Sequence, residues 1–335
     1  MISEKLAGHF FGVGSLGEPN PSVPIDYVKK LILPYSYAIT SLRDEDMIRQ
    51  FAALVEDYEE KGDFILDIDL QTYREITSED EPLLLDKDHG HSLYLMMDGT
   101  RYSYFKTQQT APATMCFSTR DVGGKQHITK KMFHFYQRLM MRVAEGITNH
   151  LRKSCDKIIL CQDDPGLGFV IDMIRRDQVP RLTVEEIIDK TDRIYPENVI
   201  PAFHYCDDWR QVEVDGWYPL WESPLKIIHI DLVRYSPELD QTQSEKMNEF
   251  LKRGGGFALG VLPNVDDGYS APVLETLESN LRNCLILLSE SGVDMDRIRT
   301  NSMLSTQCGL SGASPTLCRE IHEKSSQFHD IFFQT

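Results

Sequence analysis

Positive charge and long apolar runs are both scarce in this sequence. Its 335 residues include 35 Lys and Arg against 52 Asp and Glu, which gives a formal net charge of −17. Because phosphate backbones and anionic membrane surfaces are bound by clustered Lys and Arg, the acidity argues against a nucleic-acid partner or a membrane surface. No stretch reaches ~18 consecutive apolar residues, so no membrane-spanning helix is expected.

Cysteine is sparse as well. The seven cysteines are spread between Cys116 and Cys318 and form no dense framework. This distribution is typical of reduced thiols in the cytosol rather than of a disulfide scaffold. Residues 1–11 include Glu4 and Lys5 and lack the long apolar stretch of a signal peptide. We therefore expect a cytoplasmic protein.

Short apolar runs alternate with helix-length segments along the chain. The expected strands are residues 9–13, 64–70, 106–115, 157–162, 199–206, 226–232, 257–263 and 301–306. The expected helices are residues 44–59, 129–151, 183–191, 271–292 and 315–328, mostly from apolar residues at helical spacing. Such alternation is typical of parallel βα units, and eight strands predict one α/β domain over residues 1–335, a (β/α)8 TIM barrel. An open doubly wound sheet is the alternative.

The strongest chemical signal lies at the end of one expected strand. His204 and Cys206 are two residues apart there. Side chains two apart in an extended segment point to the same side, so both can reach one metal ion. By itself, a His-x-Cys pair is more often a buried cysteine beside a hydrogen-bonded histidine.

Two further residues stand at the ends of other expected strands. Asp231 follows one apolar run and Cys308 follows another. In a barrel the carboxyl ends of the strands converge on the face that carries the active site. Alone, Cys308 would be a small core residue and Asp231 a helix N-cap. With His204 and Cys206 they supply the N, S, S and O ligands that suit zinc.

This ligand set favours one kind of chemistry. Two thiolates and a carboxylate offset the +2 charge of zinc, which becomes a mild Lewis acid that still deprotonates an incoming thiol. The resulting thiolate stays nucleophilic. Zinc sites that activate water are usually richer in histidine. Alkyl transfer to a thiol is therefore the favoured reaction.

The order of the motifs resembles the C-terminal catalytic barrel of cobalamin-independent methionine synthase, in the group that shares its barrel with uroporphyrinogen decarboxylase. That family has a Gly-Ser turn, an Asp-Glu-Pro strand end, a His-x-Cys pair, an acidic ligand and a late Cys-Gly-Leu. Here these read Gly12-Val13-Gly14-Ser15, Asp163-Asp164-Pro165, His204-Tyr205-Cys206, Asp231 and Cys308-Gly309-Leu310. The resemblance spans nearly the whole chain.

The resemblance implies a zinc-dependent S-methyltransferase that converts homocysteine, or a related thiol, into methionine or its thioether counterpart. It implies that Zn²⁺ is bound by His204, Cys206, Asp231 and Cys308. It also implies that Gly14 and Ser15 hold the substrate carboxylate and that Asp163 holds the ammonium group, with Asp163 and His204 as the catalytic residues.

The sequence departs from the family at two positions and leaves the methyl donor open. Asp231 stands where the family has a glutamate, and Asp164 replaces the glutamate of Asp-Glu-Pro. Because the resemblance is to the C-terminal barrel of the family's synthase alone, the donor stays open between a methylfolate, a methylcorrinoid protein and another small methyl compound. Two other functions remain: a metal-free decarboxylase-like barrel, and a zinc barrel that binds a thiol or a corrinoid protein without turnover.

Overall fold

A sheet of six parallel strands forms the centre of the computed structural model, which describes residues 4–56, 58–179 and 181–335. The strand order is β11-β10-β9-β8-β7-β5. Sheet neighbours follow one another along the chain with helices between them, as parallel pairing requires. The strands are β5 Phe105–Thr110, β7 Ile158–Asp163, β8 Val199–His204, β9 Ile227–Asp231, β10 Gly256–Leu262 and β11 Ser302–Thr306.

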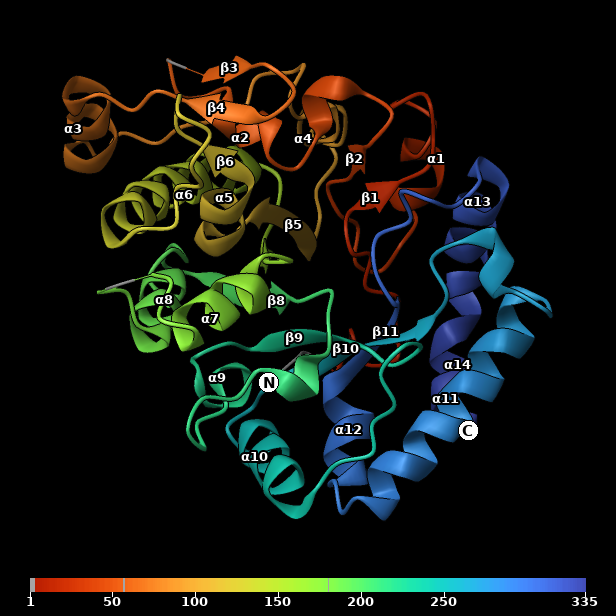
Figure 1. Ribbon diagram of the computed structural model, residues 1–335. Coiled ribbons are helices and arrows are strands. Elements are labelled where there is room, and N and C mark those ends of the chain that lie inside the picture. Colours follow the sequence, from red (N-terminus) through yellow and green to blue (C-terminus); the bar gives the residue numbers. More distant parts are fainter. Residues whose placement is uncertain (1–3, 57, 180) are drawn as a thin grey trace.

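The helices between these strands, and two that follow the last strand, lie outside the sheet (Figure 1). They are α5 Pro112–Ser118, α6 Lys130–Leu151, α7 Leu167–Arg175, α8 Val184–Asp192, α9 Pro219–Glu222, α10 Gln241–Lys252, α11 Val273–Glu290, α12 Met295–Asn301, α13 Pro315–Lys324 and α14 Phe328–Gln334. Side-chain oxygens of Thr129 and Thr183 cap α6 and α8, as threonine at an N-cap does. The helices expected near residues 129–151, 183–191, 271–292 and 315–328 are confirmed, the last as α13 and α14. Among the described residues, no helix is both long and apolar enough to cross a membrane.

Two N-terminal segments lie along the edges of this sheet. Phe10 forms a parallel bridge with Leu304 of β11, and Tyr35 forms one with Lys106 of β5. Farther along, β1 Ser15–Leu16 pairs in parallel with β2 Ala38–Ile39, and the short helix α1 Ile25–Val28 connects them. Each edge strand is thus hydrogen-bonded to one segment, and the two segments are hydrogen-bonded to each other.

The strand expected at residues 64–70 does not join the main sheet. β4 Phe64–Leu66 pairs antiparallel with β3 Tyr58–Glu60 and parallel with β6 Thr119–Arg120. α3 Leu70–Ser78 follows, and the side chain of Asp69 caps it. The alternation of apolar and acidic residues that predicted the strand therefore belongs to a small separate sheet. The place beside β5 is taken by residues 34–39, which have no long apolar run.

The helix expected at residues 44–59 is wrong. The segment contains a 3-10 turn at Arg43–Glu45, the short helix α2 Arg49–Ala52 and the beginning of β3, with residue 57 outside the described residues. Asp46 Oδ1 accepts hydrogen bonds from the backbone N–H groups of Ile48 and Arg49, at 2.9 and 3.0 Å. This local bonding starts a new turn at Asp46 and competes with a continuous helix. Helix α4 His91–Leu95 and 3-10 turns Trp209–Gln211, Asp266–Gly268 and Ser325–Gln327 complete the helical elements.

The inner side of the curved sheet changes from apolar to polar toward the carboxyl ends of the strands. A second buried cluster, separate from the main core, takes side chains from every parallel segment: Leu6, Phe11, Leu33, Tyr104, Ile159, Cys161, Ala202, Ile227, Ala258 and Met303. Because strand side chains alternate, residues two or four positions later point to the same side. These are Asp163 in β7, His204 in β8 and His229 in β9. The fold therefore places polar groups at one end of an apolar interior.

Gly146 in the middle of α6 permits a close contact with the segment before α4. A Cβ at this position would lie 2.0 Å from the carbonyl oxygen of Leu83. We predict that Gly146→Ala lowers the free energy of unfolding by up to about 2 kcal/mol, because overpacking costs about 1–3 kcal/mol and alanine recovers only ~1 kcal/mol of that through its helix propensity. Urea unfolding tests this, with the exposed Asn149→Ala as the control. Increased stability of Gly146→Ala would contradict the close contact.

Candidate metal and substrate site

The curvature of the sheet brings together residues that lie on distant strands. β8 and β11 are separated by β9 and β10. In a flat sheet, three strand spacings would keep them about 14 Å apart. The Sγ atoms of Cys206, just after β8, and Cys308, just after β11, are nevertheless 3.5 Å apart. The strand ends therefore converge on the inner side of the sheet.

His204, Cys206 and Cys308 form a compact group of metal-binding atoms. His204 Nε2 lies 2.9 Å from the sulfur of Cys206 and 3.6 Å from that of Cys308. Tetrahedral zinc, with bonds of about 2.3 Å to sulfur and 2.0–2.1 Å to nitrogen, separates its ligand atoms by about 3.5–3.8 Å. The distance from His204 to Cys308 and the distance between the two sulfurs match this spacing. The distance from His204 to Cys206 is shorter and is that of a hydrogen bond. Among the described residues, no other group of three such side chains is this close.

The surroundings of this group favour one thiolate. The side-chain hydrogen bond with Cys206, aided by His204, lowers the pKa of Cys308. The same hydrogen bond, together with burial, raises the pKa of Cys206. Burial lowers the pKa of His204, but its hydrogen bond to Cys308 and the charge of that sulfur outweigh burial and raise it overall. Since the thiolate is the form that binds metal, Cys308 is already poised as a ligand.

Asp231, the fourth expected ligand, is not one of the three residues whose ligand atoms lie close together. Its carboxylate is fully buried and accepts hydrogen bonds from the backbone N–H groups of Val233 and Arg234, both at 2.9 Å. The Arg234 guanidinium pairs with the other oxygen at 2.5 Å and also donates to the carbonyl of Cys206. The turn that ends β9 therefore uses this carboxylate as an internal cap, and the described structure leaves three candidate ligands.

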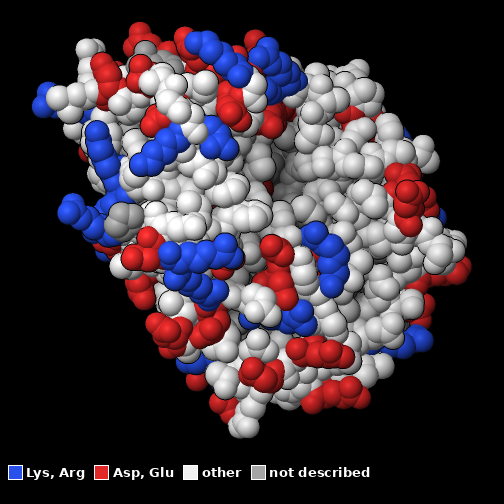
Figure 2. All heavy atoms as spheres, in the orientation of Figure 1, with Lys and Arg blue, Asp and Glu red and all other residues white. Residues whose placement is uncertain are grey.

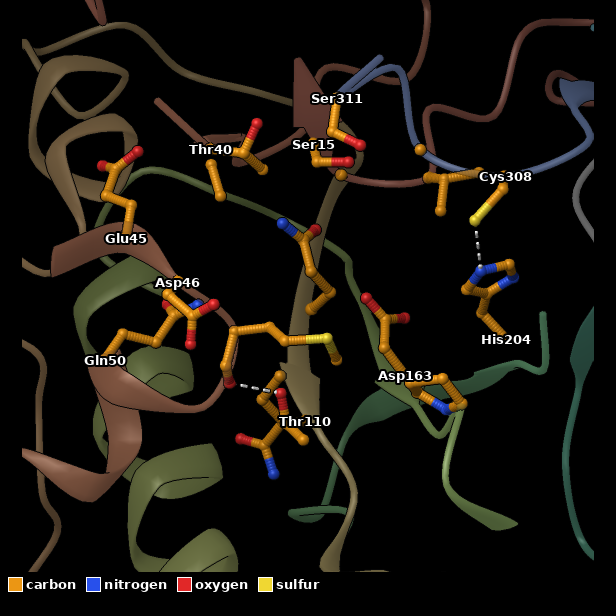
Figure 3. A pocket seen from close by; sticks show the side chains of 18 of the residues that line it. Ser15, Thr40, Glu45, Asp46, Gln50, Thr110, Asp163, His204, Cys308 and Ser311 are labelled. Carbon is orange, nitrogen blue, oxygen red and sulfur yellow. Dashed lines mark hydrogen bonds between the residues drawn. The ribbon is translucent and has the colours of Figure 1, made fainter. Parts of the chain in front are cut away.

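A cavity of about 320 Å³ opens beside the three ligands. The space-filling view shows a hollow on this side of the molecule (Figure 2). Side chains of Ser15, Asp163, His204 and Cys308 are directed toward the same space, with Ser311 beside Ser15 (Figure 3). A cavity of this size holds a small molecule. The metal-binding group is therefore open to a ligand from one side.

Asp163 supplies an unpaired carboxylate oxygen to this cavity. It is the last residue of β7 and lies beside His204 in the strand register. Its Oδ1 atom is buried and has no hydrogen-bond partner among the described residues. Burial raises the pKa of Asp163. Because buried polar atoms are nearly always paired in native proteins, this oxygen is suited to receive a donor from a ligand.

The glycine-rich turn and the late cysteine loop are in close contact. Gly14 has a φ of +147°, and a Cβ there would lie 2.6 Å from the side chain of Gln108. A Cβ at Gly309 would lie 2.0 Å from Ser15 Oγ, and the Leu310 N–H donates to the carbonyl of Ser15 at 2.8 Å. The positive φ of Gly14 favours glycine, and a Cβ at Gly309 would force the Ser15 side chain to shift. The expected substrate residues Gly14 and Ser15 thus border the same cavity as the metal group.

The outer part of the cavity comes from residues that the sequence did not single out. Glu45, Asp46 and Gln50 line it (Figure 3). The Thr110 hydroxyl donates to the carbonyl of Met47 at 2.7 Å, which fixes their segment against the end of β5. The two partners are 63 positions apart in the sequence. No local pattern therefore marks this part of the site.

His229 is a second residue that the sequence did not single out. It is fully buried in β9, paired in register with His204. The Nδ1 atoms of the two rings are 2.8 Å apart, and His229 Nε2 lies 2.8 Å from the carbonyl oxygen of Thr306. A signal was present, since His229 is a polar residue two positions before Asp231 in an otherwise apolar run.

Comparison with known proteins supports the fold. No family model and no curated protein matches the chain. Among solved structures, a B12-independent methionine synthase from Shewanella sp. W3-18-1, in complex with selenomethionine, is similar over 98% of this chain and 98% of that chain, with a TM-score of 0.56 and 13% sequence identity. At this identity the likeness shows the fold alone, which is a mixed α/β structure with a parallel sheet, similar to that of a barrel-like protein.

Asp164, behind the cavity, makes stability depend on pH. It is fully buried, and one oxygen accepts from Thr114 while the other has no partner among the described residues. Burial raises the pKa of Asp164 from 3.8 to about 7. The folded chain therefore holds this proton more tightly than the unfolded chain. The stabilisation is present below pH ~4 and is lost as pH rises toward 7, with an upper limit of about 4 kcal/mol.

We predict that Asp164→Asn removes this contribution, so that the free energy of unfolding falls less between pH 4 and 7 than in the wild type. Chemical denaturation across that range is the measurement. Exposed Asp156, which pairs with Arg101 at 2.7 Å, provides the matched control as Asp156→Asn. Identical pH profiles for wild type and Asp164→Asn would contradict the raised pKa.

Proposed function

We propose that this protein is a zinc-dependent methyltransferase that transfers a methyl group to a thiol, with homocysteine as the acceptor and methionine as the product. The observation that carries the proposal is the open group of His204, Cys206 and Cys308 at the wall of a small-molecule cavity. The solved relative with the same overall fold is a B12-independent methionine synthase.

We also propose that the chain is one domain over residues 1–335 with a closed (β/α)8 barrel. Support comes from the bridges that link Phe10 to β11 and Tyr35 to β5, and from the pairing of β1 with β2. The inner apolar cluster, which draws on every parallel segment, agrees with a barrel interior. An open sheet would leave two unpaired edges.

His204, Cys206 and Cys308 would hold the zinc ion. Structural zinc sites have four protein ligands, whereas catalytic sites have three and keep one position open. The internal pairing of Asp231 with Arg234 supports the open type. A zinc ion held by these three residues would supply the Lewis acidity that lowers the pKa of a thiol at the open position.

The remaining residues would orient an amino-acid thiol in the cavity. Asp163 Oδ1 would receive the ammonium group, and Ser15 with the turn at Gly14 would receive the carboxylate. The thiol would lose its proton to solvent, its sulfur would form a bond to the methyl carbon, and the bond between that carbon and the donor would break with its electron pair left on the donor. Orientation of the sulfur in line with the methyl group supplies much of the rate. Selenomethionine in the solved relative is an amino acid of the corresponding product class.

The donor is a methylfolate or a methylcorrinoid protein under this proposal. None of the described residues that line the cavity is Lys or Arg. The anionic tail of a polyglutamylated folate would therefore have to lie outside it. Methyl-transfer assays with homocysteine, run in parallel with methylfolate and methylcobalamin, distinguish the donors. Absence of product with either donor, despite bound zinc, would favour a binding protein over an enzyme.

Removal of either cysteine ligand should abolish zinc binding. We predict about one zinc ion per chain in the wild type and almost none in Cys206→Ser or Cys308→Ser. A serine hydroxyl is a poor zinc ligand, so each variant would keep only one cysteine and one histidine to bind the ion. Elemental analysis of folded protein measures this. Cys284→Ser, which changes a buried thiol of α11, is the control. Full zinc content in both ligand variants would contradict the site.

Asp163→Asn should weaken recognition of the substrate ammonium. We predict a rise in KM for homocysteine of about tenfold to a hundredfold, since a hydrogen bond to a charged group contributes about 1.5–3 kcal/mol. Steady-state kinetics measures it. The matched control is a homocysteine analogue without the amino group, on which variant and wild type should have similar kcat/KM. An equal loss on both substrates would remove Asp163 from ammonium binding.

A further inference from the structure

The ring of His204 is held from behind by a second histidine. His204 Nε2 faces the sulfurs of Cys206 and Cys308, and its other ring nitrogen, Nδ1, faces His229 Nδ1 at 2.8 Å. The two rings meet edge to face, with centroids 4.4 Å apart and planes at 79°. The contact lies between register partners on adjacent strands, so the backbone ladder of β8 and β9 fixes it.

The hydrogen bond between His229 and Thr306 decides which ring nitrogen donates in the contact between the two histidines. His229 Nε2 lies 2.8 Å from the carbonyl oxygen of Thr306 in β11. A carbonyl oxygen only accepts hydrogen bonds, so Nε2 of His229 carries a proton. A neutral imidazole has one N–H, which leaves Nδ1 of His229 as an acceptor. The proton between the two rings therefore belongs to Nδ1 of His204.

In its neutral form, a His204 ring with this proton on Nδ1 has its lone pair on Nε2, directed at the two sulfurs. His229 is fully buried and His204 is 2% exposed, and the ring of Phe11 packs beside His229 at 6.3 Å between centroids. If either ring changed its tautomer, a ring nitrogen would lose its hydrogen-bond partner, and no solvent is close enough to replace that partner. The opposite tautomer of His229 would direct its Nδ1–H at His204 and its bare Nε2 at a carbonyl oxygen.

We propose that His229, anchored by the Thr306 carbonyl, is a positioning residue that holds His204 in the tautomer and orientation needed to ligate a metal ion through Nε2. The proposal rests on the zinc site proposed above. Partners of this kind behind a metal-binding histidine typically change metal affinity by 10–100-fold when removed. Here the partner is a neutral imidazole that belongs to the neighbouring strand.

The first test reads the tautomers of the zinc-loaded wild-type protein by ¹⁵N NMR of labelled histidines. His229 should carry its proton on Nε2, and a coupling across the hydrogen bond should link its Nδ1 to Nδ1 of His204. A proton on Nδ1 of His229 in zinc-loaded protein would overturn the inference alone. Failure of the folded protein to take up zinc would overturn the proposed metal site as well, so the two failures are distinguishable.

The second test compares variants by zinc competition with a chromophoric chelator and by the absorption spectrum of the cobalt-substituted protein. His229→Leu should weaken zinc binding about 10–100-fold and change the cobalt spectrum. His229→Asn keeps an acceptor and a donor and should recover most of the affinity. The control is His322→Leu. His322 is also buried and also hydrogen-bonded through both ring nitrogens, one to the Tyr35 hydroxyl and the other to the backbone carbonyl of Cys318. Wild-type affinity in His229→Leu, or no recovery in His229→Asn, would overturn the proposal.

Discussion

The convergence of parallel strands is the constraint on which the candidate site depends. Cys206 and Cys308 are about a hundred residues apart and follow strands with two others between them, yet their sulfurs are 3.5 Å apart. Curvature of the hydrogen-bonded ladder brings these strand ends close enough for the contact. Every other feature of the site, from the cavity to the pairing of His204 with His229, lies on the inner side of that curve.

Polarity along the inner side explains why chemistry is confined to one end. The same alternating positions that carry Ile159 and Ala202 in the interior carry Asp163 and His204 at the carboxyl ends. Apolar packing stabilises the strands, and the polar groups beyond it are buried among partners rather than solvated. Two parts of the site can still bind a ligand. Asp163 has a carboxylate oxygen without a hydrogen-bond partner among the described residues, and the three metal-binding residues line the cavity. The Asp231 carboxylate, which lies equally deep, is fully used by the turn after β9.

Local sequence patterns predicted the elements whose contacts are local. Helix α6 and most strands of the main sheet follow from periodicity, and His204, Cys206 and Cys308 follow from strand ends that converge. Residues 34–39 were not predicted as a strand of the sheet, because their pairing with β5 rests on backbone hydrogen bonds and the segment has no apolar run. Asp46 interrupts the helix expected around it through its own hydrogen bonds. The role of His229 depends on register between strands, which one sequence does not specify.

X-ray absorption at the zinc edge, with and without homocysteine, tests the central claim most directly. A three-ligand open site predicts two sulfurs and one imidazole nitrogen from the protein, completed by a light atom, with a third sulfur in place of that atom once homocysteine binds. An unchanged sulfur count in the presence of saturating homocysteine, or a coordination shell already filled by four protein ligands, would contradict the account.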